Sequence, residues 1–291
     1  MTNENPIEKT IRNVELFLKQ QAELFGDETF LPAASAQLDA TQGNASTPAE
    51  VKKQAQQKKE NEQESAGFLG TDLKQKPKTI KVTEDRELFE GAVPTRSGWK
   101  IDPHWYESES LESLNSKVSG CLKCPLGSTR KNFVFGVGNP DAKLVLIGEA
   151  PGADEDEQGE PFVGRAGQLL TKILAAVQLR REDVYICNIL KCRPPNNREP
   201  LPTEVEACEP YLKKQLEIIK PKLIMCLGRI AGQSLLKTNT TLSELRNNIY
   251  EYQGIKVLVT YHPAALLRNP NWKRPAWEDV QKMRKLYDEL P

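Results

Sequence analysis

The chain has 291 residues, enough for one large domain or two small ones of roughly 100–200 residues each. Lys and Arg together number 40, as do Asp and Glu, so attraction to a polyanion must come from local clusters of charge. No apolar run approaches the ~18 residues of a membrane span, and the start, MTNENPIEKT, lacks the basic and apolar segments of an export signal. Composition therefore excludes a membrane protein and favours a cytoplasmic one.

Residues 1–30 are expected to contain an amphipathic helix at 5–25. Pro6 suits the first helical turn, Glu8 completes a capping box, and Gly26 ends the helix. Apolar side chains recur along one stripe of this helix, namely Ile7, Ile11, Val14 and Leu18. The helix either docks a protein partner or caps the rest of the chain.

Residues 31–114 are expected to form a low-complexity or sparsely structured linker. Within it, AASAQLDATQGNASTPAEVKKQAQQKKENEQESAG has no aromatic residue and consists mainly of Ala, Gln, Lys, Glu and Ser. Such a stretch cannot bury enough apolar surface to offset the loss of chain entropy on folding. We therefore expect a largely disordered N-terminal extension before the folded part of the chain.

From about residue 115 to 291, short apolar runs alternate with stretches of helical period. The runs are KLVLIG, DVYICNIL, KLIMCLG and KVLVTYH, and the helical stretches are GQLLTKILAAVQ, TEVEACEPYLKKQLEII, RIAGQSLLK and AWEDVQKMRKLYDEL. Nearly continuous Val, Ile and Leu strands between helices are typical of a parallel sheet with both faces covered. The pattern predicts one α/β domain at 115–291 with a central parallel sheet of four strands.

Four sequence features follow the ends of these strands, where ligands bind in such folds. They are GEAPG after the first strand, Asn188 at the end of the second, GRIAG after the third and YHPAALLR after the fourth. We expect them to converge on one cleft. The loop GEAPGADEDEQGEPFVGRAG is longer than a turn requires, and its carboxylates would repel a phosphate, so it favours a neutral, polar ligand.

The six cysteines divide into two groups. Cys187 and Cys226 lie inside apolar strands, where a cysteine behaves as a small hydrophobic residue. The other four lie in loops or at helix starts: Cys121, Cys124, Cys192 and Cys208. These four are expected to form one structural metal centre, of zinc or of iron and sulfur, since four protein ligands leave no open position. Spacing does not choose between the metals, and two unrelated thiol pairs are the alternative.

Several long motifs carry a resemblance to a known family. GEAPGADEDEQGEPFVGRAGQLL, VYICNILKCRPPNNREP, the cysteine at 208 and TYHPAALLR closely resemble the family 4 uracil-DNA glycosylases, over about residues 118–290. The resemblance implies a three-layer α/β/α sandwich around a parallel sheet. It also implies a 4Fe–4S cluster, which favours iron over zinc at the four cysteines. Uracil is a neutral, polar ring that a glycine-lined wall can approach.

The resemblance implies two catalytic residues. Glu149 would stabilise the sugar cation or orient the attacking water; otherwise it is an acidic loop residue that binds backbone amides. Better-known uracil glycosylases carry an Asp at the next position, which is Ala150 in this chain. Family 4 members share the lack of that Asp. His262 would donate a hydrogen bond to uracil O2 as negative charge grows there, and a neutral imidazole suffices for this role.

The base itself would be held by the residues lining the pocket, with Gly148, Ala150 and Gly152 forming part of the wall. Phe162 would stack on the extruded ring, unless it is ordinary core packing. Asn188 would read the Watson–Crick edge of uracil, unless it makes a turn bond at the strand end. Glu155 would obstruct the methyl group of thymine near the C5 edge, with Asp154 and Asp156 as adjacent candidates for this role.

The segment HPAALLRNPNWKR suits the extrusion of a base from duplex DNA. Pro263 begins it, Leu266 or Leu267 would enter the vacated stack, and Arg268, with Lys273 and Arg274, would meet phosphates. Lys191, Arg193 and Arg198 are expected to add to the same basic face. A solvated, charged surface is the alternative for any one of these Lys and Arg residues.

The resemblance thus implies a monomeric base-excision repair enzyme that releases uracil from single- and double-stranded DNA and acts at the nucleoid. A non-catalytic iron–sulfur module that binds uracil-DNA or DNA, or serves a polymerase, is the alternative. A uracil-DNA cross-linking relative would carry an inserted basic segment with a reactive His, which is absent here. A nucleotide-binding α/β protein is a further alternative, but GEAPG matches neither the G-x-G-x-x-G fingerprint nor the P-loop.

Overall fold

The computed structural model describes residues 79–82 and 102–291, and the structural statements below concern this part of the chain. The expected helix at 5–25 and most of the expected linker at 31–114 lie outside the described residues.

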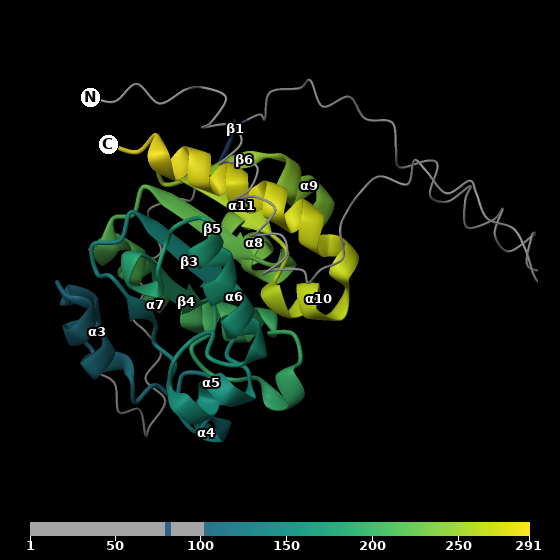
Figure 1. Cartoon of the computed structure of the whole chain (residues 1–291). Helices are drawn as coiled ribbons and strands as arrows, with labels where there is room; N and C mark the ends of the chain where they lie inside the picture. Colours follow the sequence, from purple (N-terminus) through teal and green to yellow (C-terminus); the bar gives the residue numbers. More distant parts are fainter. Residues whose placement is uncertain (1–78, 83–101) are drawn as a thin grey trace, which may run out of the picture. The chain divides into compact units, whose positions relative to one another are not determined.

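The described part is built on one seven-stranded sheet of order β1-β6-β7-β5-β3-β4-β2 (Figure 1). The strands are β1 Thr79–Val82, β2 Val137–Gly138, β3 Leu144–Gly148, β4 Tyr185–Asn188, β5 Leu223–Leu227, β6 Ile249–Tyr252 and β7 Ile255–Thr260. The four central strands, β7, β5, β3 and β4, run parallel and coincide with the four apolar runs. The predicted parallel core is therefore confirmed.

The expected number of four strands is too low, because three strands flank this core. β2 is antiparallel to β4, β6 is antiparallel to β7, and β1 is parallel to β6. None of the three has a continuous apolar run. β2 contains only two residues, and β6, IYEY, alternates between half-buried and buried positions. β6 lies between β1 and β7, and an alternating strand has a weaker sequence signal than one buried on both faces.

Helices cover both faces of the sheet. The longer ones are α3 Leu111–Val118, α6 Arg165–Ala176, α7 Pro202–Ile219, α8 Arg229–Leu236 and α11 Lys273–Asp288. The shorter ones are α4 Leu126–Thr129, α5 Ala153–Gln158, α9 Leu242–Asn247 and α10 Pro263–Arg268. Single 3-10 turns lie at Trp105–Glu107, Arg181–Asp183, Pro195–Asn197 and Pro270–Trp272.

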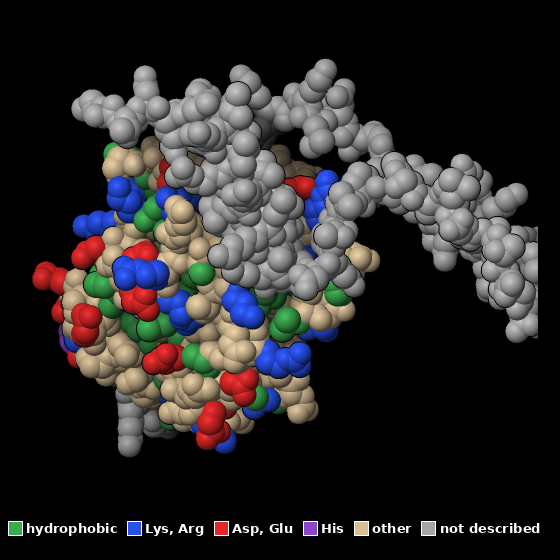
Figure 2. Space-filling model, in the orientation of Figure 1, with side chains coloured by type: hydrophobic (Ala, Val, Ile, Leu, Met, Phe, Trp, Pro, Cys, Tyr) green, Lys and Arg blue, Asp and Glu red, His purple; other side chains and the backbone are tan. Residues whose placement is uncertain are grey.

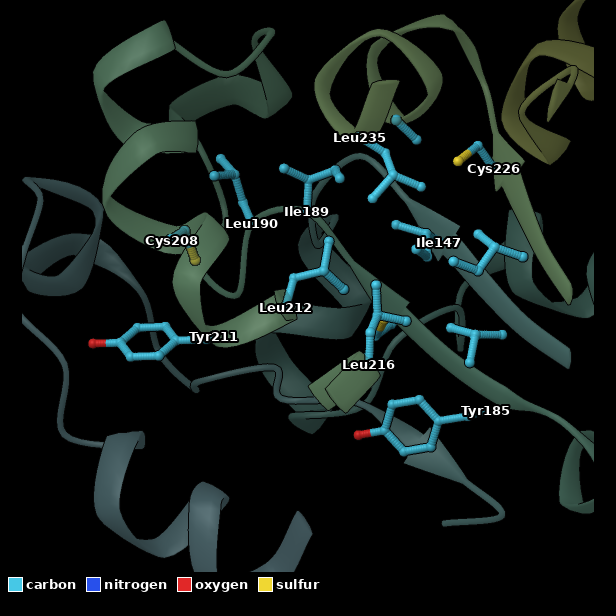
Figure 3. Close-up of a cluster of buried hydrophobic side chains, with 14 of the residues drawn as sticks. Ile147, Tyr185, Ile189, Leu190, Cys208, Tyr211, Leu212, Leu216, Cys226 and Leu235 are labelled. Atoms are coloured by element: carbon cyan, nitrogen blue, oxygen red, sulfur yellow. The ribbon is translucent and has the colours of Figure 1, made fainter. Parts of the chain in front are cut away.

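Two buried clusters show that the architecture has three layers. Successive residues of β3 point to opposite faces, so Val145 and Ile147 pack with α3, α7, α8 and α9, as part of the cluster in Figure 3. Leu144 and Leu146 pack on the other face with α6 and α11. Every residue of β3 and β5 is buried as a result. The α/β/α sandwich is confirmed.

The packed region extends N-terminally of residue 115. Ser110 caps α3 by accepting a hydrogen bond from the Ser113 amide at 3.1 Å. Trp105 is buried and meets the ring of Tyr211 edge-on, with 5.0 Å between the ring centroids. None of the helices in the described ranges combines the length and the apolar character that a bilayer crossing requires.

Candidate active site

Three predicted side chains lie together beyond the strand ends. Gly148 at the end of β3 pairs with Asn188 at the end of β4. A Cβ on Gly148 would lie 2.3 Å from Asn188 Oδ1 and 2.6 Å from Phe162 Cζ, so only glycine fits here. The rings of Phe162 and His262 are 5.5 Å apart between centroids and inclined by 31°. We call Phe162, Asn188 and His262 the strand-end site.

Gly228, at the end of β5, also contributes to this arrangement. Its φ of 101° lies in the region that favours glycine, and a Cβ there would lie 3.1 Å from the His262 Cβ. The four strand ends singled out in the sequence therefore surround one place in the structure.

Asn188 presents an unused acceptor. The residue is only 1% exposed, and its Oδ1 has no hydrogen-bond partner among the residues that the structure describes. Its main-chain oxygen accepts a hydrogen bond from Lys191 Nζ at 2.9 Å. A buried acceptor without a partner costs about 1–3 kcal/mol, so its presence at a strand end indicates a place for a ligand donor.

His262 is held as a neutral donor. It is the N-cap of α10, and its Nδ1 accepts a hydrogen bond from the Ala264 amide at 3.1 Å, which leaves the proton of the neutral ring on Nε2. Burial, with a smaller contribution from Arg268, lowers the pKa of His262 to about 4. The imidazole is therefore uncharged near neutral pH and offers an N–H group from Nε2.

A buried ion pair that the sequence analysis missed holds the chain just before His262. Arg246 Nε lies 2.7 Å from Asp279 Oδ2, and Thr260 Oγ1 donates to the same oxygen at 2.7 Å. The Arg246 guanidinium also lies over the Tyr261 ring, 4.4 Å from its centroid. Arg246 and Asp279 are far apart in sequence and belong to no motif, so only the structure could reveal this support.

Phe162 is buried and adopts a left-handed backbone conformation with a φ of 56°. This conformation costs free energy for a bulky residue and persists where the surroundings hold it. Arg181 provides such support, since its two terminal nitrogens donate to Phe162 O at 3.1 Å and to Pro161 O at 2.9 Å. The aromatic ring is thus fixed on a rigid loop.

Glu155 anchors the same loop. Its Oε1 accepts hydrogen bonds from the amides of Val163 and Gly164, both at 3.0 Å, and its Oε2 accepts from the Gly152 amide at 3.1 Å. The structure therefore places this carboxylate on backbone amides, as part of the capping box of α5. Blocking the C5 edge of a base stays a prediction for Glu155.

Glu149 and Ala150 directly follow β3 and are half-buried. The Glu149 main-chain oxygen accepts a hydrogen bond from the Leu190 amide at 3.0 Å. Burial raises the pKa of the Glu149 carboxyl above its usual value; Glu199 also raises it, while Arg229 opposes the rise. The carboxylate thus lies beside the Arg229–Glu199 ion pair, whose atoms are 2.6 Å apart.

The segment predicted to meet DNA presents one leucine and buries the other. In α10, Pro263 is buried and Leu266 is 3% exposed, packed with Leu169 and Ala276, whereas Leu267 is 41% exposed. Arg268 is exposed as well. An apolar cavity behind α10 is lined in part by Leu266, but none of the strand-end site residues lines it.

The predicted basic face is wrong for Lys191, and Arg198 of the same face is paired with a carboxylate. Lys191 is 0% exposed and cannot meet a phosphate, because its Nζ donates to two buried acceptors. Arg198 forms a bidentate pair with Glu204, with distances of 2.9 and 2.6 Å. Figure 2 shows that acidic and basic side chains are interspersed on the face it displays.

The four cysteines expected to bind a metal come together in the buried cluster that contains α3 and α7, although Cys208 lies within α7 and not in a loop or at a helix start. All four are free thiols, and Cys121, Cys192 and Cys208 are buried while Cys124 packs against them. Burial is the main reason why the pKa values of Cys192 and Cys208 are raised to about 12. Arg130 opposes the rise at Cys192 and Lys191 opposes it at Cys208, while neighbouring cysteines of the group add to it. We call these four residues the cysteine centre.

Four hydrogen-bond donors reach sulfur atoms of the cysteine centre. Cys121 accepts from the Lys123 amide at 3.4 Å and from the Tyr211 hydroxyl at 3.3 Å. The amide of Lys191 donates to Cys208 at 3.3 Å, and Arg130 donates to Cys192 at 3.3 Å. Donors of this kind stabilise thiolates and tune metal–sulfur clusters.

The other two cysteines lie elsewhere in the core. Cys187 in β4 and Cys226 in β5 each pair in register with Ile147 of β3, and both are fully buried. In Figure 3, Cys226 is well separated from Cys208. Across residues 79–82 and 102–291, no three His, Cys, Asp or Glu side chains form a group suited to a single metal ion.

Comparison with known proteins identifies the class first. The family model of the uracil DNA glycosylase superfamily matches residues 135–281, which include β3, β4, β5, β7 and the strand-end site. Among curated relatives, the type-4 uracil-DNA glycosylase of Archaeoglobus fulgidus is 50% identical over 186 residues, 61% of this chain and 94% of that protein.

Two further relatives carry the same description. The type-4 uracil-DNA glycosylase of Thermotoga maritima is 45% identical over 180 residues, 60% of this chain and 94% of that protein. The one of Sulfurisphaera tokodaii is 43% identical over 187 residues, 61% of this chain and 85% of that protein. The chain therefore belongs to the type-4 uracil-DNA glycosylases.

Proposed function

We propose that this protein removes uracil from DNA by hydrolysing the N-glycosidic bond, which leaves an abasic site for base excision repair. The observation that carries the proposal is the buried Oδ1 of Asn188, which has no hydrogen-bond partner in the described part of the chain and lies beside the rings of Phe162 and His262. Uracil has the complementary shape and polarity, namely a flat ring with an N3–H donor between two carbonyl acceptors.

Asn188 and Phe162 supply recognition. The Asn188 carbonyl accepts from uracil N3–H while its NH2 group donates to O4, and Phe162 stacks on the ring. Cytosine has an acceptor at N3 and a donor at C4, so it would leave the buried amide unmatched. A site built to hydrogen-bond one edge rejects an analogue that lacks it, because buried polar groups then stay unpaired.

His262 and Glu149 supply the chemistry. As the glycosidic bond breaks, electrons move to the base and negative charge develops at O2, where the His262 Nε2–H donates a hydrogen bond. A neutral donor suffices, and the lowered pKa of His262 favours this form. The ionised Glu149 carboxylate stabilises the positive charge of the sugar or orients the water that adds to C1′. The water proton is then released as the abasic sugar forms.

Base extrusion assigns a role to α10. Of the two leucines, Leu267 is exposed and able to enter the stack, whereas Leu266 is packed and would have to unfold locally. Leu267→Ala should therefore slow release from duplex DNA several-fold, by about 3- to 10-fold, and leave release from single strands unchanged. Leu266→Ala should instead lower the free energy of unfolding by about 2–5 kcal/mol. Slower release from single strands by Leu267→Ala would contradict this assignment.

The residues of the cysteine centre fit a 4Fe–4S cluster. They provide four free thiols without a disulfide and four donors to sulfur, as cluster ligands require. Cys121 and Cys124, before β3, and Cys192 and Cys208, after β4, would hold the cluster, which with four protein ligands would link these two segments rigidly. A cluster distributes its thiolates over separate iron atoms, so its ligands stand farther apart than those of a single ion.

One assay tests the proposed release of uracil, and a second tests the metal content of the cysteine centre. Purified protein should release uracil from single- and double-stranded oligonucleotides, and binding without release would instead support a non-catalytic module. The protein should also contain iron and absorb near 400 nm. Cys208→Ala should lose both properties, whereas the matched core variant Cys226→Ala should keep them. Iron retained at the wild-type level by Cys208→Ala would refute the ligand assignment.

A further inference from the structure

Lys191 is a fully buried lysine that the proposed chemistry does not use. It lies three residues after Asn188 and immediately before Cys192, between the strand-end site and the cysteine centre. Burying an ammonium group costs free energy unless acceptors and opposite charge surround it. An apolar side chain would fill the same space at lower cost, so a fully buried lysine at this position calls for a specific explanation.

The side chain of Lys191 connects the end of β4 to α7. Its Nζ donates to the main-chain oxygen of Asn188 at 2.9 Å and to Gln215 Oε1 at 2.6 Å. Gln215 is itself 0% exposed, and its Nε2 donates to Phe135 O and to the Tyr185 hydroxyl, both at 3.0 Å. The ammonium therefore holds the backbone at Asn188 within a closed buried network.

The main chain of Lys191 connects the same position to the cysteine centre. Its amide donates to Cys208 Sγ at 3.3 Å, and its oxygen accepts from the Val134 amide at 2.8 Å. Within the described ranges, no carboxylate pairs with Lys191 Nζ. Burial lowers the pKa of Lys191, and the thiols of Cys187, Cys208 and Cys192 oppose this shift. The coupling therefore rests on the hydrogen bonds of Lys191 and not on its charge.

We propose that Lys191 is a positioning residue: it fixes the backbone of the base-reading Asn188 by the hydrogen bond from its Nζ and couples it to the cysteine centre by the hydrogen bond from its main-chain amide. The inference rests on the proposed function, since it assigns Asn188 to base recognition. It would explain why a structural metal centre has a ligand, Cys192, only four residues after the strand end that reads the base. The hydrogen bond from Lys191 Nζ to the main-chain oxygen of Asn188 holds the backbone from which the base-reading side chain projects.

The main test compares Lys191→Met with Lys214→Met. Lys214 is also a buried lysine, 8% exposed, but its Nζ pairs with Glu217 at 2.9 Å and lies outside the network. Lys191→Met should slow single-turnover release of uracil from single strands by about 10- to 100-fold, as expected for a misplaced recognition group. It should also speed hydrogen exchange of the Ile189 and Leu190 amides, and Lys214→Met should do neither.

A double variant separates positioning from general destabilisation. In an Asn188→Ala background, Lys191→Met should cause no further slowing, because the group that it positions is already gone. If Lys191→Met does not fold, Gln215→Met interrupts the same network from α7 and should give the same results. Cys208→Ala should also speed exchange at Ile189 and Leu190, which is a readout independent of catalysis.

Two results would overturn the inference. One is release by Lys191→Met within about twofold of the wild type, well below the loss expected of a misplaced group. The other is equal slowing by Lys191→Met with and without Asn188, which would indicate a purely structural effect. Absence of release by the wild type would instead refute the proposed function, and the exchange measurements would then still decide whether Lys191 holds the strand end.

Discussion

The strand-end site and the cysteine centre lie at opposite ends of the segment 188–192. They differ in how far hydrogen bonds within the protein satisfy their polar atoms. At the strand-end site, Asn188 Oδ1 has no hydrogen-bond partner among the described residues, and the His262 ring makes its only hydrogen bond to those residues through Nδ1. At the cysteine centre, amide, hydroxyl and guanidinium donors reach the sulfur atoms of Cys121, Cys192 and Cys208.

This difference distinguishes a site that binds a ligand reversibly from a site that holds a group permanently. An unmet buried acceptor costs about 1–3 kcal/mol in the free protein, and a ligand that supplies the donor recovers this cost. Sulfur atoms that already accept hydrogen bonds gain little free energy from a reversibly bound ligand. Their hydrogen bonds instead hold the surrounding segments in place. Substitutions at the strand-end site should therefore affect catalysis more than stability, and substitutions at the cysteine centre should do the reverse.

The largest effect is expected from His262→Ala. Loss of a fixed donor to the developing negative charge should lower the single-turnover rate of uracil release by about 100- to 1,000-fold. Thermal unfolding followed by circular dichroism should show a minor change by comparison. The control is His104→Ala, which replaces the other histidine of the chain, an exposed residue paired with Glu107. A rate within about tenfold of the wild type would place the donor elsewhere.

Asn188→Ala should come next, with a rate lowered by about 10- to 100-fold, since recognition of the base edge is lost. Its free energy of unfolding, measured with denaturant, should not fall, because the substitution removes an acceptor that has no partner in the described part of the chain. Asn115→Ala, at an exposed position of α3, controls for the loss of an amide. A marked loss of stability would break the distinction between the two sites.

The sequence predicted much of the fold and the site because both rest on local signals. Continuous apolar runs marked β3, β4, β5 and β7, and residues that follow strand ends marked Asn188 and His262. The three strands that flank the parallel core were not predicted, because very short or alternating segments carry little pattern. Lys191 was misplaced on the surface because its burial depends on Gln215, which is distant in sequence.

The same reasoning explains the other omissions. Arg246 and Asp279 support the strand before His262 but lie 33 positions apart, so no motif joins them. Phe162 was assigned from its loop, yet its left-handed backbone and its support by Arg181 arise only from tertiary contacts. Residues that touch a ligand recur at strand ends, whereas the residues that position them can come from anywhere in the chain.

Tyr211→Phe tests the cysteine centre with a smaller effect. It removes the hydroxyl that donates to Cys121 Sγ and keeps the ring that packs on Trp105. The free energy of unfolding should fall by about 0.5–1.5 kcal/mol, and iron should be lost faster to a chelator. Uracil release by the iron-loaded variant should match that of Tyr106→Phe, which alters an exposed tyrosine. Slower release with unchanged stability would reverse the comparison.

The smallest effect is expected from pH near neutrality. With the pKa of His262 lowered to about 4, the ring stays neutral between pH 6 and 8, so the release rate should change by less than about twofold over this range. An acid limb should appear as Glu149, whose pKa is raised by burial, becomes protonated, and Glu149→Gln should lack this limb. A rate inflection near pH 6.5 that disappears in His262→Gln would contradict a neutral donor.

The free energy of unfolding should depend on pH through His262, whereas the release rate near neutrality should not. The folded pKa lies below the unfolded value of 6.5, so the folded state binds fewer protons between these two values. The contribution of His262 to stability is then fully present above pH 6.5 and is lost as the pH falls toward 4. Denaturant unfolding at pH 7 and pH 5 should show a smaller loss for His262→Gln than for the wild type. Equal losses would mean that the ring is not buried in its neutral form.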